Sequence, residues 1–247
     1  MIRKAFILFS ILFFNKTPFA HAQSVNQQAW FEYMLNYPFA NSFNLENAFT
    51  YSTLLSQPKW RAVEYNGTVE YSISPSFDIV GAGLISYTLQ NDNYNTLELR
   101  PMLGTKIYFT PNRRIQMRLL LRLEQRNFQN LDTKEWEHVM RPRARAEVVI
   151  PLNQDSYFKD NLWYAVMDAE WLFVTTDVKE RFANRFRFRI GAGYRLNYSF
   201  RFEVLYMNQQ SRNGIDEAFS SSDNVLRIRL KHFLRATKPA KTGGDGN

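Results

Sequence analysis

The chain has 247 residues, a formal net charge of +8 and no cysteine. Without cysteine it cannot be a small domain held by disulfides, and it cannot use a thiolate metal site. Its length suits one all-β domain, since β-barrels of about 200–250 residues fold as single units. The positive charge leaves nucleic acid, anionic lipid and anionic solutes open as partners, and the placement of the charges has to distinguish them.

The N-terminal segment has the pattern of a secretory signal peptide. Arg3 and Lys4 form a basic start, 5–14 is an uninterrupted apolar run, and Ala20-His21-Ala22 gives the small-x-small pattern that signal peptidase accepts. An uncleaved membrane helix would need ~20 apolar residues, about twice the length of this run. We therefore predict that 1–22 is a cleaved signal peptide and that the mature chain is exported.

From Trp30 onward, apolar and polar residues alternate along most of the chain. In 61–73, for example, Val63 and Tyr65 share one face of an extended chain and Glu64 lies on the other. Side chains of a strand point alternately to opposite sides, so a period of two indicates one apolar and one polar face. Charged residues interrupt every later apolar segment, so no membrane-spanning helix is predicted.

The alternation predicts about eleven strands, many of them long enough to cross a membrane at a tilt, which takes about 9–11 residues. In chain order the candidate strands are 30–37, 43–53, 61–73, 77–90, 97–109, 115–124, 136–150, 163–173, 186–196, 201–206 and 226–234. Bacterial barrels normally have an even number of strands. The prediction is therefore a barrel of ten to twelve strands, with ten if 30–37 lies outside the wall and twelve if one strand has no clear pattern.

The segments between these strands alternate in length, as they do in outer-membrane barrels. Tight turns are predicted at 74–76, 110–113 and 197–199. Longer polar loops are predicted at 91–95, 129–135, 175–184 and 210–223. The segment 151–161 is an exception, because it is long where a short turn is expected.

Periodicity alone does not say which face is inside, because a soluble periplasmic binding barrel has the same alternation with the faces reversed. The polar face is rich in arginine interleaved with carboxylates, and the planar guanidinium pairs bidentately with carboxylates in confined space. The apolar face carries aromatic residues, which form girdles at membrane interfaces. These aromatic residues are Tyr71, Phe77, Tyr87, Phe109, Trp136, Trp163, Trp171 and Tyr206. We predict an all-β fold: a single antiparallel transmembrane barrel over 23–234 in the outer membrane, followed by a disordered polar tail over 235–247.

Two stretches resemble a known family. The opening Trp30-Phe31-Glu32-Tyr33 and the run 182–210 (FANRFRFRIGAGYRLNYSFRFEVLYMNQQ) are similar to the outer-membrane barrels of domain-of-unknown-function family 2490. The resemblance covers nearly all of the mature chain. It implies an outer-membrane barrel and transfers no catalytic residue, because the family has no assigned activity.

Enzymatic barrels need a nucleophile or paired acids with a positioned base. His138 and His232 share the parity of apolar neighbours and are predicted to face outward, and no G-x-S-x-G motif occurs. Asp168 and Glu170 are interpreted as counter-charges for arginines rather than as an acid–base pair, since ion-pair networks imitate active sites. We therefore predict no catalytic residue, and the chain is interpreted as a non-enzyme.

Metal, cofactor and nucleotide sites are not predicted either. The histidines have no ligand spacing. The Gly-x-Gly motifs at Gly81 and Gly83, and at Gly191 and Gly193, lack the strand-to-helix context of a nucleotide loop and indicate a bend or a close backbone approach. Nucleic acid is not predicted as a partner, because the basic residues lie within strands on an inward face and the chain is exported.

The most informative feature is a ladder of charges on the polar face, which we predict to point into the barrel lumen. Its cations are Arg118, Arg122, Arg126, Arg141, Arg143, Arg145, Arg185, Arg187, Arg189, Arg195, Arg227 and Arg229. Its carboxylates are Glu98, Glu124, Glu147, Asp168, Glu170 and Glu203.

This ladder has three interpretations. It can fill a structural barrel with salt bridges, make a narrow channel selective for small polar or anionic solutes, or hold lipid phosphate near the outer rim. The first two are the preferred functions. A lipid- or lipopolysaccharide-modifying barrel enzyme and a soluble periplasmic binding barrel are the alternatives. The expected partners are outer-membrane lipid and lipopolysaccharide, with small anionic solutes as candidate ligands, and the pattern predicts no oligomeric state.

Overall fold

The structure is a computed structural model of the chain, and it describes residues 25–40, 42–56, 59–90, 95–111, 113–173, 184–212 and 219–235. The predicted signal peptide over 1–22 and the predicted tail beyond Arg235 lie outside these residues. In the described part of the chain, no helix has the length and hydropathy needed to cross a membrane.

The described residues form eleven β-strands of 11 to 16 residues. They are β1 (Asn26–Ala40), β2 (Phe43–Leu54), β3 (Arg61–Ser74), β4 (Phe77–Leu89), β5 (Thr96–Tyr108), β6 (Gln116–Asn130), β7 (Trp136–Pro151), β8 (Leu162–Leu172), β9 (Asn184–Arg195), β10 (Phe200–Arg212) and β11 (Ser220–Phe233). Each lies at a segment that the alternation identifies as a strand, because each has one face that is apolar and one that is polar.

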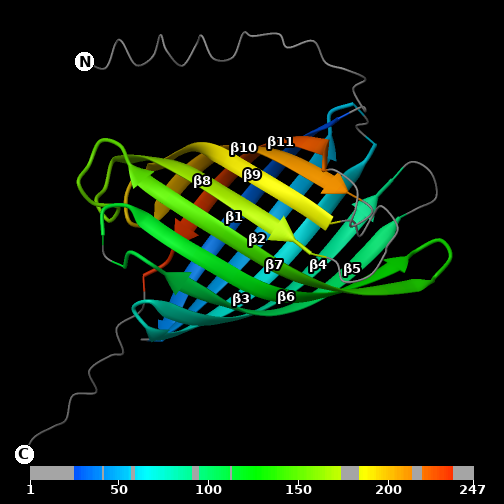
Figure 1. Cartoon of the computed structure of the whole chain (residues 1–247), viewed down its shortest axis with the longest axis horizontal. Helices are drawn as coiled ribbons and strands as arrows, with labels where there is room; N and C mark the ends of the chain where they lie inside the picture. The colour runs from blue at the N-terminus through cyan, green and yellow to red at the C-terminus, as the bar shows by residue number, and fades with distance from the viewer. Residues whose placement is uncertain are drawn as a thin grey trace, which may run out of the picture.

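Each strand pairs antiparallel with the next along the chain, and the sheet closes on itself as a barrel. Figure 1 shows the strands as one tilted, closed wall. The closing pair, β1 with β11, is parallel and runs from Asn26 opposite Asp223 to Asn36 opposite Phe233.

The eleven strands lie within the predicted range of ten to twelve, whereas the expectation of an even number is wrong. A barrel in which every neighbouring pair is antiparallel must have an even number of strands, because its first and last strands then run in opposite directions. Here β1 and β11 run in the same direction and pair as a parallel ladder. A parallel ladder also pairs the backbone groups of both edges, so the barrel closes with eleven strands. The segment 30–37 is a wall strand within β1 and forms one side of this seam.

The odd number of strands places the beginning of β1 and the end of β11 at opposite ends of the barrel. The end where β1 begins, called the long-loop end here, carries the connections 55–60, 90–95, 131–135, 173–183 and 213–219. The other end, called the short-turn end, carries 41–42, 75–76, 109–115, 152–161 and 196–199. The shortest connections, 41–42, 75–76 and 196–199, lie at the short-turn end as the sequence pattern predicts, and the exceptions there are 109–115 and 152–161.

The two faces of the wall differ sharply in polarity. In β1, Phe31 is 48% exposed and the next residue, Glu32, is 8% exposed. In β6, Leu123 is 46% exposed and Glu124 is completely buried. Successive side chains of a strand point to opposite sides, so the exposed apolar residues form the outer surface and the buried polar residues point inward.

A small apolar core fills part of the short-turn end. Val149, Leu162, Tyr164, Val166 and Leu205 are buried together there, and Tyr157 packs against them. The Tyr164 ring lies directly over Gly193, where a Cβ atom would come within 2.3 Å of the ring carbon Cζ. Gly193 is therefore a close-approach glycine, whereas a Cβ atom at Gly81 or Gly83 would meet nothing within 4 Å.

Candidate functional site

The barrel encloses a cavity of about 840 Å³, lined by inward side chains from all eleven strands. Fifteen of the lining residues are cationic and eight are acidic. The cations are Arg100, Lys106, Arg118, Arg122, Arg126, Arg141, Arg143, Arg145, Arg185, Arg187, Arg189, Arg201, Arg227, Arg229 and Lys231. The acids are Glu32, Glu46, Glu64, Glu70, Glu98, Glu147, Asp168 and Asp223.

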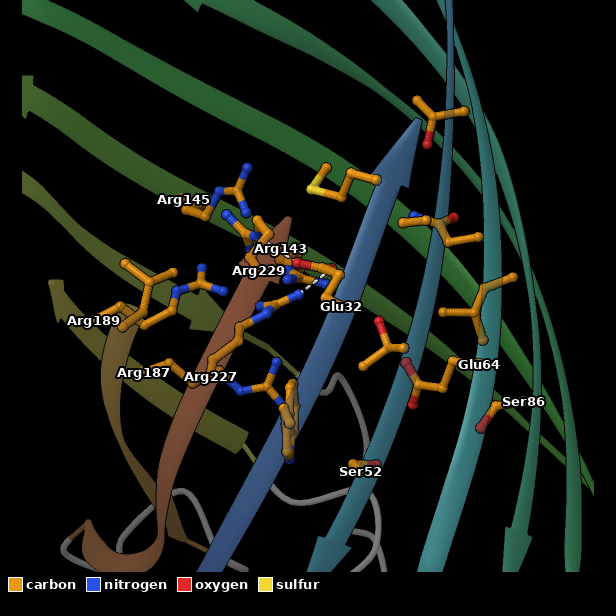
Figure 2. A pocket seen from close by; sticks show the side chains of 18 of the residues that line it. Glu32, Ser52, Glu64, Ser86, Arg143, Arg145, Arg187, Arg189, Arg227 and Arg229 are labelled. Atoms are coloured by element: carbon orange, nitrogen blue, oxygen red, sulfur yellow. Dashed lines mark hydrogen bonds and ion pairs between the residues drawn. The ribbon is translucent and has the colours of Figure 1, made fainter. Parts of the chain in front are cut away.

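These charges are divided between two sides of the cavity. All fifteen cations come from β5–β11, which we call the basic wall. The cavity-lining side chains of β1–β4, which we call the acidic wall, are acidic, amide, hydroxyl or apolar. Figure 2 shows Arg143, Arg187 and Arg227 on the basic side, with Glu64 and Ser86 on the strands across from them.

The basic wall contains its own counter-charges. Glu124, which is fully buried, accepts a hydrogen bond from Arg141 Nη2 at 2.6 Å and from Arg143 Nη1 at 2.9 Å. Arg122 lies 2.7 Å from the same carboxylate. Each oxygen of this buried acid is therefore held by guanidinium groups from its own strand and the next.

Glu170 on β8 is the second fully buried carboxylate of the basic wall. It pairs with Arg143 on one side, and with Arg187 and Arg189 at 3.5 Å on the other. Arg189 Nε also donates to Asp168 at 2.7 Å. Arg143 thus joins the Glu124 group to the Glu170 group, and the network runs across β6–β9.

A separate group of ion pairs spans the parallel seam. Glu32 on β1 accepts hydrogen bonds from Arg227 and Arg229 on β11. Arg229 Nη1 also donates to Glu203 on β10 at 2.8 Å, and Lys231 Nζ donates to the same carboxylate at 2.6 Å. The pairing of β1 with β11 is therefore reinforced from inside the barrel.

Two further ladder carboxylates, Glu98 and Glu147, pair with arginines of a neighbouring strand. Glu98 accepts from Arg126 at 2.6 and 2.9 Å, and Arg118 lies 2.5 Å from Glu147. Arg145 is held only loosely, at 4.0 Å from Glu147 of its own strand.

Fourteen of the eighteen predicted ladder residues line the cavity. Glu124, Glu170 and Glu203 are enclosed by the cations that hold them. Arg195 lies at the short-turn end, where its nearest carboxylate is Asp160 at 3.6 Å.

The ladder predicted from sequence omits the acidic wall. Four acids line the cavity from β1–β3: Glu32, Glu46, Glu64 and Glu70. The alternation of polar and apolar residues in the sequence already places them on the inward face of their strands. The pattern there is less conspicuous, because hydroxyl, amide and small residues separate the acids. Arg100, Lys106, Arg201 and Lys231 also belong to the lining and share the parity of the ladder.

The long connection 152–161 reaches into the barrel at the short-turn end. The Tyr157 ring meets Tyr164 edge-on at 5.6 Å, and its hydroxyl accepts a hydrogen bond from Arg201 Nη1 at 2.6 Å. The Arg201 guanidinium also lies 4.2 Å from the centre of the Phe233 ring. On the outer side of this connection, a 2.7 Å hydrogen bond from the Lys159 ammonium lowers the pKa of the exposed Asp155 carboxyl.

A second cavity of about 440 Å³ lies at the short-turn end. It shares five lining residues with the main cavity, and we call these the waist: Tyr108, Arg118, Glu147, Tyr157 and Lys231. The two spaces therefore adjoin at the waist, where Arg118 and Glu147 form an ion pair.

The two histidines, which the sequence predicts to face outward, do not line the cavity. His138 is on the outer surface and hydrogen-bonds the Asn127 side chain at 2.7 Å. His232 hydrogen-bonds the Tyr33 hydroxyl at 2.8 Å and stacks on Phe200. Among the described residues, no group of three or more histidine or acidic side chains is placed to hold a metal ion.

Comparison with known proteins gives a family and a distant structural likeness. No curated protein matches the chain. The anion-selective porin from Comamonas acidovorans is similar in structure with a TM-score of 0.37 and 12% identity, over 80% of this chain and 54% of the porin, so the chain spans about half of that protein's length. The model of the family described as "Protein of unknown function (DUF2490)" matches residues 27–220. The chain belongs to this family, as its opening Trp30-Phe31-Glu32-Tyr33 and the run 182–210 predict.

Proposed function

We propose that the protein is exported through its segment 1–22, is embedded in the outer membrane, and forms a narrow channel for small anionic solutes. The outer wall supports the membrane location. Leu103 and Val63 are 65% and 57% exposed, and aromatic residues such as Trp163 share the same face. Burying apolar surface in lipid is worth about 25 cal/mol per Å², so this surface favours a bilayer over water.

The strand geometry supports the same location. The shortest strand has 11 residues and the longest 16, and a tilted strand needs about 9–11 to cross the hydrocarbon layer. We place the short-turn end in the periplasm, since outer-membrane barrels have short turns on that side. Lipid and lipopolysaccharide are then the partners of the outer wall.

The charge surplus of the cavity is the observation that carries the channel proposal. Fifteen cations line the cavity, and they outnumber its acids even when Glu124, Glu170 and Glu203 are added to the eight lining acids. Concentrated arginine or lysine in a narrow pore attracts anions and repels cations. Small anions are therefore the solutes that this interior favours.

A filled structural barrel is the second candidate, and the enclosed ion pairs favour it. Glu124 and Glu170 have no exposed surface, and Tyr157 packs against the buried apolar cluster inside the short-turn end. In that case the arginines serve the stability of the wall, and the cavity holds only water.

Single-channel recording separates the two. The chain from Gln23 onward, inserted in a planar bilayer, is expected to give discrete current steps. In Arg145→Glu the charge of the most loosely paired ladder arginine is reversed, so the current at low salt is expected to fall several-fold. Lys59→Glu makes the same charge change at an exposed position outside the cavity and is expected to change the current far less. Insertion without current would overturn the channel and leave the structural barrel.

A further inference from the structure

We propose that the cavity takes small zwitterions crosswise, with their anionic group on the basic wall and their cationic group at Glu64 on the acidic wall. This inference rests on the proposed channel and names the solute class that best fits its interior.

Two acids of the acidic wall are unpaired. Glu32 is engaged by Arg227 and Arg229, and Glu70 by Lys106. Glu46 and Glu64 line the same cavity and form no ion pair within 4 Å with any residue of the described chain.

The surroundings of Glu64 suit a cationic group. Thr50 on β2 and Ser86 on β4 are its register partners and line the cavity with it, and both carry hydroxyl oxygens. Asn66 is the next inward residue of β3, and its side-chain oxygen is buried without a hydrogen-bond donor in the described structure. An ammonium group offers the donors that these oxygens lack.

One cation of the basic wall acts on this group from a distance. Arg100 on β5 donates to Glu98 at 2.7 Å and attracts Glu64 electrostatically, without forming an ion pair with it within 4 Å. Across the cavity, Arg143, Arg187 and Arg227 point inward from strands of the basic wall (Figure 2). These arginines already hold Glu124, Glu170 and Glu32, but Arg227 Nε is buried without a hydrogen-bond partner in the described structure, so the basic wall keeps a donor for an anionic group.

A solute that carries both charges can satisfy both walls at once. Its carboxylate would meet guanidinium forks, which bind carboxylates bidentately, and its ammonium would meet the Glu64 carboxylate and its neighbouring oxygens. A monoanion of the same size satisfies only the basic wall, and a monocation of that size is repelled there. The division of the walls therefore favours zwitterions over either singly charged analogue.

Three four-carbon solutes test this: γ-aminobutyrate, butyrate and butylammonium. Each is added to the chain from Gln23 onward in a planar bilayer that carries a chloride current. γ-Aminobutyrate is expected to halve the current at a concentration about ten-fold lower than butyrate, with butylammonium weakest, since one charge-assisted contact is worth roughly that factor. In Glu64→Gln this preference is expected to disappear, whereas in Glu135→Gln, an exposed acid of a connection, it is expected to remain.

Asn66→Ala serves as a second variant if Glu64→Gln fails to insert, and a several-fold weaker preference is expected from it. Equal block by γ-aminobutyrate and butyrate in a conducting barrel would overturn the zwitterion site and leave the anion channel standing. Absence of any chloride current from inserted protein would overturn both.

Discussion

Arg143 on β7 joins the two most deeply buried acids of the barrel, with Nη1 2.9 Å from Glu124 on β6 and its other nitrogens on Glu170 of β8. One guanidinium therefore links three consecutive strands from the inside. Both carboxylates are completely buried, so neither can turn to water if this cation is removed. The stability of this part of the wall should depend on Arg143.

Replacing Arg143 by Met should destabilise the folded barrel by about 3–5 kcal/mol, because it leaves two buried carboxylates short of a partner. The free energy of unfolding in urea, measured in lipid vesicles, checks this. Arg145→Met is the matched control, since Arg145 reaches a carboxylate only at 4.0 Å and should cost about 1 kcal/mol or less. An equal loss of unfolding free energy in the two variants would contradict the role of Arg143 as the link between the two buried acids.

Glu32→Gln should weaken the parallel seam between β1 and β11. The change removes the charge shared by Arg227 and Arg229, and Arg229 retains Glu203. A loss of about 3 kcal/mol is expected, visible as a lower temperature at which the folded barrel loses its characteristic gel mobility. Glu46→Gln, in an acid without an ion pair in the described structure, should leave that temperature nearly unchanged.

Gly193→Ala should destabilise the barrel by about 1–3 kcal/mol, since the new methyl group would overlap the Tyr164 ring. Gly83→Ala adds the same group where nothing lies within 4 Å and should be neutral or slightly stabilising. Urea unfolding of the two variants side by side measures the difference. The prediction fails if both behave alike.

Tyr157→Ala should widen the waist and raise the single-channel conductance by roughly a factor of two, since this ring lines both cavities where they adjoin. Leu152→Ala, at an exposed position of the same connection, is the control and should conduct like the unchanged chain. An unchanged conductance in Tyr157→Ala would place the narrowest point elsewhere.

The sequence predicts the wall because each strand is a local pattern. The alternation of 61–73 needs no other segment to be recognised, and all eleven strands follow from it. The closing pair is different, because the parallel ladder of Asn26 with Asp223 joins segments nearly 200 residues apart and leaves no local signal. The even strand count fails for that reason.

The candidate site is predicted only in part for a related reason. The alternation of side chains along a strand places Arg118 and Arg187 on its inward face. The ion-pair partner of each arginine, however, depends on the register between neighbouring strands. Register and closure also bring Glu32 to Arg229 and place Glu64 across the cavity from the arginines. The division into a basic and an acidic wall is a property of the closed barrel and not of any one strand.

The reversal potential of the unchanged chain, inserted in a bilayer under a potassium chloride gradient, tests the central claim most directly. The surplus of cations along the cavity predicts a potential that lies close to the chloride equilibrium potential. A potential close to that of potassium, or no current from protein shown to be inserted, would contradict an anion channel.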